Sequence, residues 1–165
     1  MTESARSTLH ERSQSVAIGC IAWGLAPGVL RAVLGSCVGI SVYDPGAKAG
    51  ALAHCLLPEG DQEDAPPAKF VASALSPLIE AAVESGARRE ALRVKLAGGA
   101  ALFTGSAKGQ GLGARNVEMA RKAIAQEGLK IVAESVGGEK GRVMEFDLET
   151  GKASVKVIGE EPVVI

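Results

Sequence analysis

VLRAVLGSCVGISVYDPGAKAGALAHCLLP, at residues 29–58, contains three apolar runs separated by turn-forming residues. Val29–Leu34 and Val38–Tyr43 are rich in β-branched residues, which predicts two strands. Asp44-Pro45-Gly46 has the composition of a turn, and Ala49–Leu57 is a third apolar run that ends before a proline. Because one short turn separates the second run from the third, we expect those two strands to pair antiparallel.

The flanking sequence predicts two helices and further strands. Apolar residues recur at helical spacing from Lys69 to Gly86 and again from Ala114 to Gln126. Pro77 interrupts the first of these helices, and Gly86 is its expected C-terminal cap. Further strands are expected at 16–23, 92–96, 129–136, 143–148 and 153–158, the last two as a hairpin. This order predicts an α+β fold with a mixed β-sheet rather than a regularly alternating parallel sheet.

Length and composition indicate one globular domain. The chain has 165 residues, of which 47% are hydrophobic, and this apolar content can offset the entropy of ordering. We expect residues 1–14, including His10, to form a disordered tail and residues 15–165 to form the domain. No stretch approaches the ~20 apolar residues of a membrane span, and the start of the chain lacks an apolar signal core. A cytoplasmic protein that is not inserted in a membrane is therefore predicted.

Charge and motif content exclude several classes of binding protein. The net charge is −1 and aromatic residues are 3% of the chain, so a nucleic-acid partner is not expected. The chain has no CxxC motif and only two histidines, so no metal site is expected. The sequence GQGLG at 109–113 fits neither GxGxxG nor the ending of a nucleoside triphosphate loop.

Cys37 and His54 are the residues best suited to chemistry. His54 is the only histidine of the predicted domain, and Cys37 follows Gly35 and Ser36, whose small size leaves the sulfur accessible. A cysteine at such a turn can receive backbone N–H dipoles, which favour the thiolate. Antiparallel pairing of the two strands can place the thiol across from the imidazole.

Structural interpretations of the same residues stay open. A histidine in an apolar strand is also typical of a hydrogen-bonded core residue, and a free cysteine of a small core hydrophobe. Because neighbouring residues of a strand face opposite ways, we expect Cys55 to point away from the partner of His54. Cys20 lies in an apolar segment without a nearby histidine, so it is expected in the core.

Several short motifs occur in order along the chain. Residues 34–38 read LGSCV, and residues 54–58 fit HxxLP. They are followed by a helix that begins at Lys69-Phe70, a GGA segment at 98–100, an RNV helix start at 115–117 and a GGxxGR segment at 137–142. This series resembles the CheD family, the chemoreceptor glutamine deamidases of bacterial chemotaxis, over most of the predicted domain.

The resemblance implies a three-layer α/β/β fold related to the cysteine-hydrolase domain of deamidating bacterial toxins. It implies that Cys37 is the nucleophile and His54 its base, with no metal or organic cofactor. Gly35 and Ser36 would support the turn or the oxyanion. Arg115 and Asn116, in the RNV motif, are interpreted as structural capping and loop-anchoring residues rather than catalytic ones.

One position departs from the family pattern. The family's third catalytic residue is a threonine six positions before the cysteine, where this chain has Arg31. A guanidinium has only donors, so it cannot accept a hydrogen bond from the imidazole as a hydroxyl can. Either another group, such as a backbone carbonyl, orients His54, or the activity is weakened. The Arg31 side chain could instead point to solvent.

The activity implied by the resemblance is deamidation of specific glutamine side chains on the cytoplasmic helices of chemoreceptors, through a Cys-His thioester. It also implies a CheC-like phosphatase as partner, which links deamidation to phosphorylated CheY. The alternative is a catalytically weakened or inactive binding module that acts through CheC, CheY or the receptor. A third hypothesis keeps the Cys-His chemistry but gives it a different amide or ester substrate.

Overall fold

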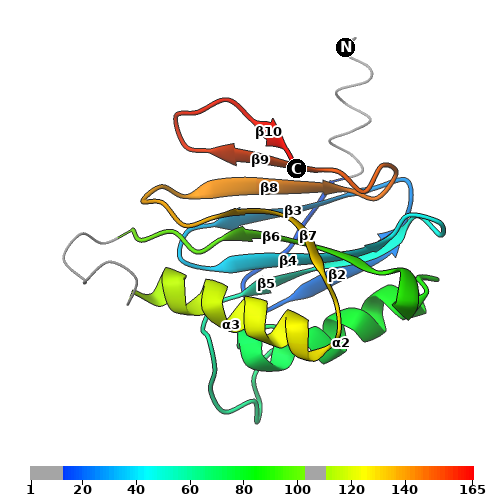
Figure 1. Ribbon diagram of the computed structural model, residues 1–165, viewed down its shortest axis with the longest axis horizontal. Coiled ribbons are helices and arrows are strands. Elements are labelled where there is room, and N and C mark those ends of the chain that lie inside the picture. Colours follow the sequence, from blue (N-terminus) through cyan, green and yellow to red (C-terminus); the bar gives the residue numbers. More distant parts are fainter. Residues whose placement is uncertain (1–12, 103–110) are drawn as a thin grey trace.

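The computed structural model describes residues 13–102 and 111–165, which form three layers (Figure 1). One layer consists of the helices α2 (Val71–Glu84) and α3 (Leu112–Gln126). The helices cover the inner sheet, which has the order β2 (Ile21–Leu25), β5 (Ala49–Cys55), β4 (Val38–Asp44), β6 (Arg93–Gly98) and β7 (Ile131–Val136). The outer sheet lies on its other face and has the order β1 (Ser13–Ser15), β3 (Val29–Leu34), β8 (Arg142–Asp147), β9 (Ala153–Val157) and β10 (Val163–Val164). A short 3-10 helix, Arg89–Ala91, precedes β6.

Both sheets are mixed, as the sequence predicts. The pairs β1–β3 and β6–β7 are parallel, and the other pairs are antiparallel. The α+β class is confirmed, and so is the antiparallel pairing of β4 with β5 across the 44–46 turn. The division of the strands into two stacked sheets agrees with the α/β/β arrangement that the family resemblance implies.

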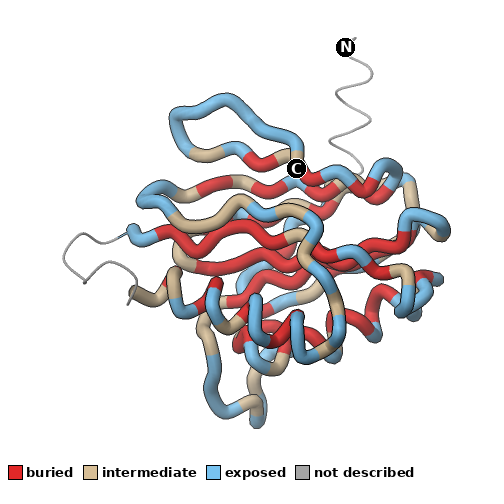
Figure 2. The backbone as a smooth tube through the Cα atoms, in the orientation of Figure 1, coloured by how far each residue is buried: buried red, intermediate tan, exposed pale blue. Residues whose placement is uncertain are grey.

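Burial follows from the layer order. All seven residues of β4 and all seven of β5 are buried, because the inner sheet is covered on both faces (Figure 2). The strand β3 alternates instead, with Leu30, Ala32 and Leu34 directed inward. Its residues Arg31 and Val33 therefore lie on the outer face of the outer sheet.

Two hydrophobic cores hold the layers together. The first lies between the helices and the inner sheet and includes Ile40, Val42, Leu78 and Ile124. The second lies between the two sheets and includes the fully buried Phe146. The helix α2 continues through Pro77 without a break in its assigned residues, because its apolar face is packed against the inner sheet. Gly86, just after this helix, has the positive φ of a C-terminal cap.

The structure corrects several expectations near the start of the chain. Residues 1–12 of the predicted tail, with His10, lie outside the described residues, but Ser13 and Gln14 belong to β1. The predicted strand at 16–23 begins only at Ile21, because residues 16–20 cross from the outer sheet to the inner one. The amide of Val16 donates to the carbonyl of Arg31 in the outer sheet, at 2.8 Å. The amide of His54 in the inner sheet donates to the carbonyl of Cys20, at 3.0 Å.

Cys20 is therefore exposed on this crossing segment. The expectation that it lies in the core was wrong, since the chain bends at Gly19 before the strand begins. The short strand β10 was not predicted from the sequence. It adds two residues to the edge of the outer sheet by pairing with β9.

Candidate functional site

Strand register places Cys37 and His54 on the same face of the inner sheet. His54 on β5 lies opposite Gly39 on β4, so the two share a face. Cys37 precedes Gly39 by two residues and belongs with it to the face that meets the outer sheet. Cys55 is in the core on the helix side, so it points away from Cys37, as strand alternation predicts. Cys37 and His54 are thus diagonal neighbours across the β4–β5 pair.

The imidazole of His54 is oriented by a main-chain oxygen. Its Nδ1 atom lies 2.8 Å from the carbonyl oxygen of Val16, in the crossing segment. A carbonyl only accepts hydrogen bonds, so Nδ1 carries the proton and Nε2 of the neutral ring is left with its lone pair. Nε2 is buried and has no hydrogen-bond partner among the described residues. The backbone carbonyl considered from the sequence is therefore present.

Burial favours the neutral form of His54. The residue is 3% exposed, and desolvation lowers its pKa below the ordinary value of 6.5, while the hydrogen bond with Val16 partly opposes this shift. A neutral imidazole with a free Nε2 can accept a proton at neutral pH. This is the state that a general base requires.

Cys37 is less accessible than the sequence suggested. It is 7% exposed and belongs to the core between the sheets. Desolvation raises the pKa of its thiol above 9.0, and the contribution of its own backbone N–H lowers it by less. The expectation of an accessible sulfur in surroundings that favour the thiolate was therefore wrong. The outer sheet covers this end of β4 and buries the thiol. Nε2 of His54 has no hydrogen-bond partner among the described residues, so the thiol and the imidazole share a face without a hydrogen bond between them.

The turn that carries Cys37 is held by hydrogen bonds that other segments donate to its carbonyl groups. The amide of Ala100 donates to Gly35 at 2.9 Å, and that of Gly99 donates to Cys37 at 2.9 Å. Between them, Nδ2 of Asn116 donates to the carbonyl of Ser36 at 2.9 Å. Every carbonyl from residue 35 to residue 37 is thus occupied by a donor from another part of the chain.

Asn116 also connects this turn to the strand of His54. Its Nδ2 atom donates a second hydrogen bond, at 3.0 Å, to the carbonyl of Leu56, two residues after His54. Asn116 is fully buried at the start of α3, and its Oδ1 atom has no partner among the described residues. The loop-anchoring role predicted for Asn116 is confirmed, whereas Arg115 beside it is exposed.

A second set of contacts supports the turn through Arg142, whose role was not predicted from the GGxxGR motif that it ends. The Nη1 atom of this buried guanidinium donates to the carbonyl of Ser135 at 2.8 Å, and Nη2 donates to Gly137. The amide of Gly137 donates in turn to the carbonyl of Gly98, beside the Cys37 turn, at 3.0 Å. The GGxxGR motif therefore braces the loop that follows β6.

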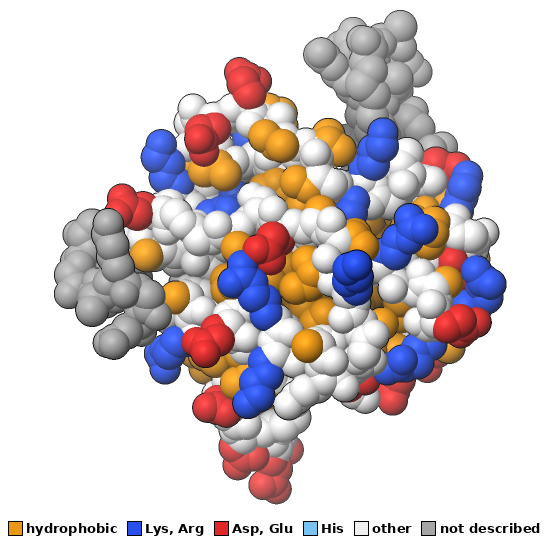
Figure 3. Space-filling view, in the orientation of Figure 1, with side chains coloured by type: hydrophobic (Ala, Val, Ile, Leu, Met, Phe, Trp, Pro, Cys, Tyr) orange, Lys and Arg blue, Asp and Glu red, His pale blue; other side chains and the backbone are white. Residues whose placement is uncertain are grey.

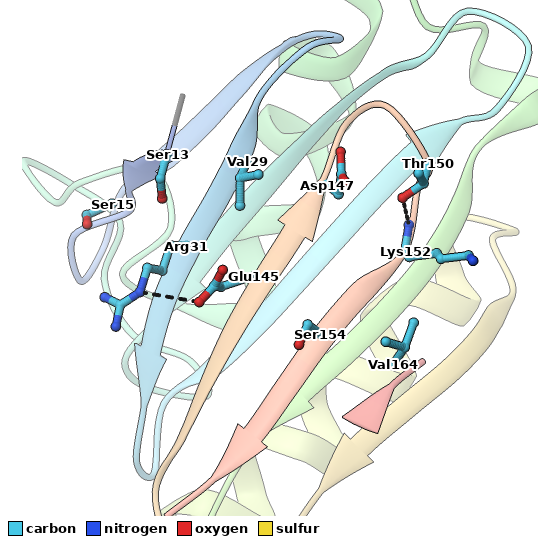
Figure 4. A pocket seen from close by; sticks show the side chains of 10 residues that line it. All are labelled: Ser13, Ser15, Val29, Arg31, Glu145, Asp147, Thr150, Lys152, Ser154 and Val164. Carbon is cyan, nitrogen blue, oxygen red and sulfur yellow. Dashed lines mark hydrogen bonds and ion pairs between the residues drawn. The ribbon is translucent and has the colours of Figure 1, made fainter. Parts of the chain in front are cut away.

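Arg31 lines the same cavity as His54. This open cavity has a volume of about 310 Å³, and its other walls are Ser15, Val16, Ala17, Ile18 and Val33. The side chain of Arg31 points away from the body of the outer sheet, and its Nε atom lies 3.9 Å from Oε1 of Glu145 (Figure 4). The solvent-directed alternative considered for Arg31 is thus the observed one. A wider groove of about 940 Å³, most of whose lining residues are polar or charged, continues from Arg31 across the outer sheet.

Other classes of site find little support in the described residues. Within 13–102 and 111–165, no three His, Cys, Asp or Glu side chains are grouped so that they could hold a metal ion. Neither α2 nor α3, the helices of the described part of the chain, is long and apolar enough to cross a membrane. The face that carries α3, β7 and β8 mixes basic, acidic and apolar side chains (Figure 3).

Comparison with known proteins gives the family. A family model described as "CheD chemotactic sensory transduction" matches residues 56–157. A chemoreceptor glutamine deamidase CheD of Thermotoga maritima is 42% identical over 134 residues, which cover 81% of this chain and 84% of the relative. The chain belongs to the CheD family. A probable chemoreceptor glutamine deamidase CheD of Natronomonas pharaonis is 41% identical over 95% of each chain, and one of Moorella thermoacetica is 40% identical over 93% of this chain and 97% of the relative.

The CheD family match includes the segments that support the Cys37 turn. Gly99 and Ala100, Asn116, and the Arg142 brace all lie between residues 56 and 157. These segments contain the GGA, RNV and GGxxGR motifs, whereas Cys37 of LGSCV and His54 of HxxLP precede the residues that the family model matches. The common role of the three matched motifs in this structure is to hold the backbone around Cys37.

Proposed function

We propose that this protein deamidates glutamine side chains of chemoreceptors, with Cys37 as the nucleophile and His54 as the general base. The observation that carries the proposal is the hydrogen bond from His54 Nδ1 to the carbonyl of Val16, which leaves Nε2 free on the face of Cys37. The names of the CheD relatives support chemoreceptor glutamine as the substrate.

The reaction proceeds in two halves. Nε2 of His54 takes the proton of the Cys37 thiol as the sulfur attacks the side-chain carboxamide carbon of the glutamine. The tetrahedral intermediate collapses to a thioester as His54 returns the proton to the leaving nitrogen, and ammonia departs. His54 then removes a proton from water, which attacks the thioester carbon. The thiol leaves with that proton, and the substrate residue is now glutamate.

Burial at the site favours proton transfer over a preformed ion pair. Because desolvation raises the pKa of Cys37 and lowers that of His54, the neutral thiol and neutral imidazole are the resting state. The thiol therefore becomes nucleophilic only as His54 accepts its proton. Backbone N–H groups of the Gly35–Cys37 turn would stabilise the oxyanion, and one such donor is typically worth about 3 kcal/mol.

The test is mass spectrometry of a purified receptor fragment incubated with the protein. Deamidation adds about 1 Da at each modified glutamine, because an amide is exchanged for an acid. We expect this change with the native chain and its loss with Cys37→Ser and with His54→Gln. Cys20→Ser is the matched control, since Cys20 is an exposed thiol outside the site. Full activity of Cys37→Ser would refute the proposed nucleophile.

Modification of some other amide or ester, with receptor fragments left unchanged, would refute the proposed substrate. We further propose that the protein acts in the cytoplasm and associates with a CheC-like phosphatase. Analytical ultracentrifugation of the two purified proteins tests that association. A chain that binds the phosphatase but never modifies a receptor glutamine would be a binding module rather than an enzyme.

A further inference from the structure

Among the described residues that line the cavity beside His54, Arg31 carries the one charged side chain. The two residues reach the cavity from different sheets, Arg31 from β3 and His54 from β5. The crossing segment joins them, because Val16 donates its amide proton to the carbonyl of Arg31 and accepts a hydrogen bond from His54. A substrate group that enters this cavity therefore meets a cation close to the imidazole.

The guanidinium is available for a ligand. Its ion pair with Glu145 runs through Nε at 3.9 Å, and both side chains are substantially exposed, so the pair contributes little. The two terminal nitrogens of Arg31 make no hydrogen bond within the described part of the chain. They point away from Glu145, toward the side on which β1 and Ser15 lie (Figure 4). The terminal nitrogens of the guanidinium can therefore donate two parallel hydrogen bonds to a carboxylate.

Apart from Arg31, Ser15 and His54, the residues that line the cavity are apolar. Ile18 and Val33 line it although they are 54% and 60% exposed. An amphipathic helix could lay its apolar side chains on this rim while its polar groups reach His54 and Arg31. On a helix, side chains three or four residues apart lie on the same face, about 5–6 Å apart.

We propose that Arg31 is a specificity-determining residue that binds a substrate carboxylate one helical turn from the target glutamine. The inference rests on the proposed function, because it assumes that a helical glutamine is presented to Cys37 and His54. To that function it adds a preference for substrates with an acidic residue near the target glutamine.

The test compares synthetic helical peptides that contain one glutamine and either Glu or Ala four residues before or after it. We expect kcat/KM for deamidation to be about five-fold higher with Glu at one of these positions, and the preference to shrink as salt is added. Arg31→Gln should abolish the preference, and Arg31→Glu should transfer it to a peptide with Lys at that position.

Lys152→Gln is the matched control. It removes one positive charge from the same groove of the outer sheet, but Lys152 does not line the cavity of His54. We expect this variant to keep the native preference for the acidic peptide.

Two results separate this inference from the proposed function. If the native chain modifies neither peptide nor a receptor fragment, the proposed function fails. If it modifies the peptides but Arg31→Gln keeps the native ratio, only the role of Arg31 is overturned. Equal loss of preference in Arg31→Gln and Lys152→Gln would also overturn it, since the effect would then arise from net charge alone.

Discussion

The carbonyl oxygen of Val16 lies 2.8 Å from Nδ1 of His54 and fixes which ring nitrogen is free to take a proton. Val16 itself is held to Arg31 of the outer sheet through its amide. The orientation of a residue in one sheet thus depends on a segment anchored in the other. The Val16 carbonyl thus supplies the hydrogen-bond acceptor that orients His54. The guanidinium of Arg31 cannot supply it, because a guanidinium has only donors.

The pH dependence of activity should report the state of His54. Only the neutral imidazole can accept the thiol proton, and burial lowers its pKa below 6.5. We therefore expect kcat/KM to rise with pH through an inflection below 6.5 and to stay level through neutral pH. The measurement is a pH–rate profile, with Trp23 fluorescence checking that the protein remains folded. An acid-side inflection above 6.5 would contradict this view of the site.

The three thiols should differ in reactivity. Cys20 is exposed, Cys37 is buried with a raised pKa, and burial raises the pKa of Cys55 to about 12. Since the thiolate is the reactive form, we expect a thiol reagent at pH 7 to label Cys20 first, Cys37 slowly and Cys55 only on unfolding. Labelling rates followed by peptide mapping check this order. In guanidinium the three rates should become similar, and faster labelling of Cys37 than of Cys20 in the folded protein would disprove it.

Asn116→Ala should impair both stability and catalysis. The substitution leaves the carbonyls of Ser36 and Leu56 without their donor, which costs about 2–4 kcal/mol in free energy of unfolding. Because those carbonyls flank Cys37 and His54, kcat should fall more than KM changes. Urea unfolding and steady-state deamidation measure the two effects. Arg115→Ala, an exposed neighbour, should change neither, and an unaffected kcat in a folded Asn116→Ala protein would count against the anchoring role.

Gly98→Ala should disturb the Cys37 turn directly. Gly98 has φ +104, and an added Cβ would lie 2.2 Å from the carbonyl oxygen of Cys37. Gly128→Ala is a matched control, because Gly128 also has a positive φ (+72) but nothing within 4 Å of the added atom. We expect a loss of about 1 kcal/mol for Gly128→Ala, from backbone strain alone, and a larger loss with little activity for Gly98→Ala. Similar stability and activity in the two variants would show that the close approach has no consequence.

Local pattern was sufficient to predict much of the central fold. The bounds of β3 and the pairing of β4 with β5 followed from apolar runs and one turn, and strand alternation predicted that Cys55 points away from the partner of His54. These features depend on neighbouring residues alone. The helices were also predictable, since their apolar faces recur at helical spacing.

Features that depend on contacts between distant segments were not predictable. Cys20 lies in an apolar segment that bends between sheets, and Cys37 is covered by strands far away in the sequence. The acceptor that orients His54 is a main-chain oxygen, which leaves no signature in the identity of residue 16. Arg142 was visible as a motif, but its role as a brace appears only when its carbonyl partners are placed in space.

The use of a peptide oxygen to orient His54 has an evolutionary consequence. Any amino acid at position 16 presents the same acceptor, so the Val16 side chain is constrained by its packing in the core between the sheets rather than by the hydrogen bond with His54. What selection must conserve is the path and the length of the 16–20 crossover. A one-residue deletion in that connector should therefore be more damaging to a lineage than most point replacements within it.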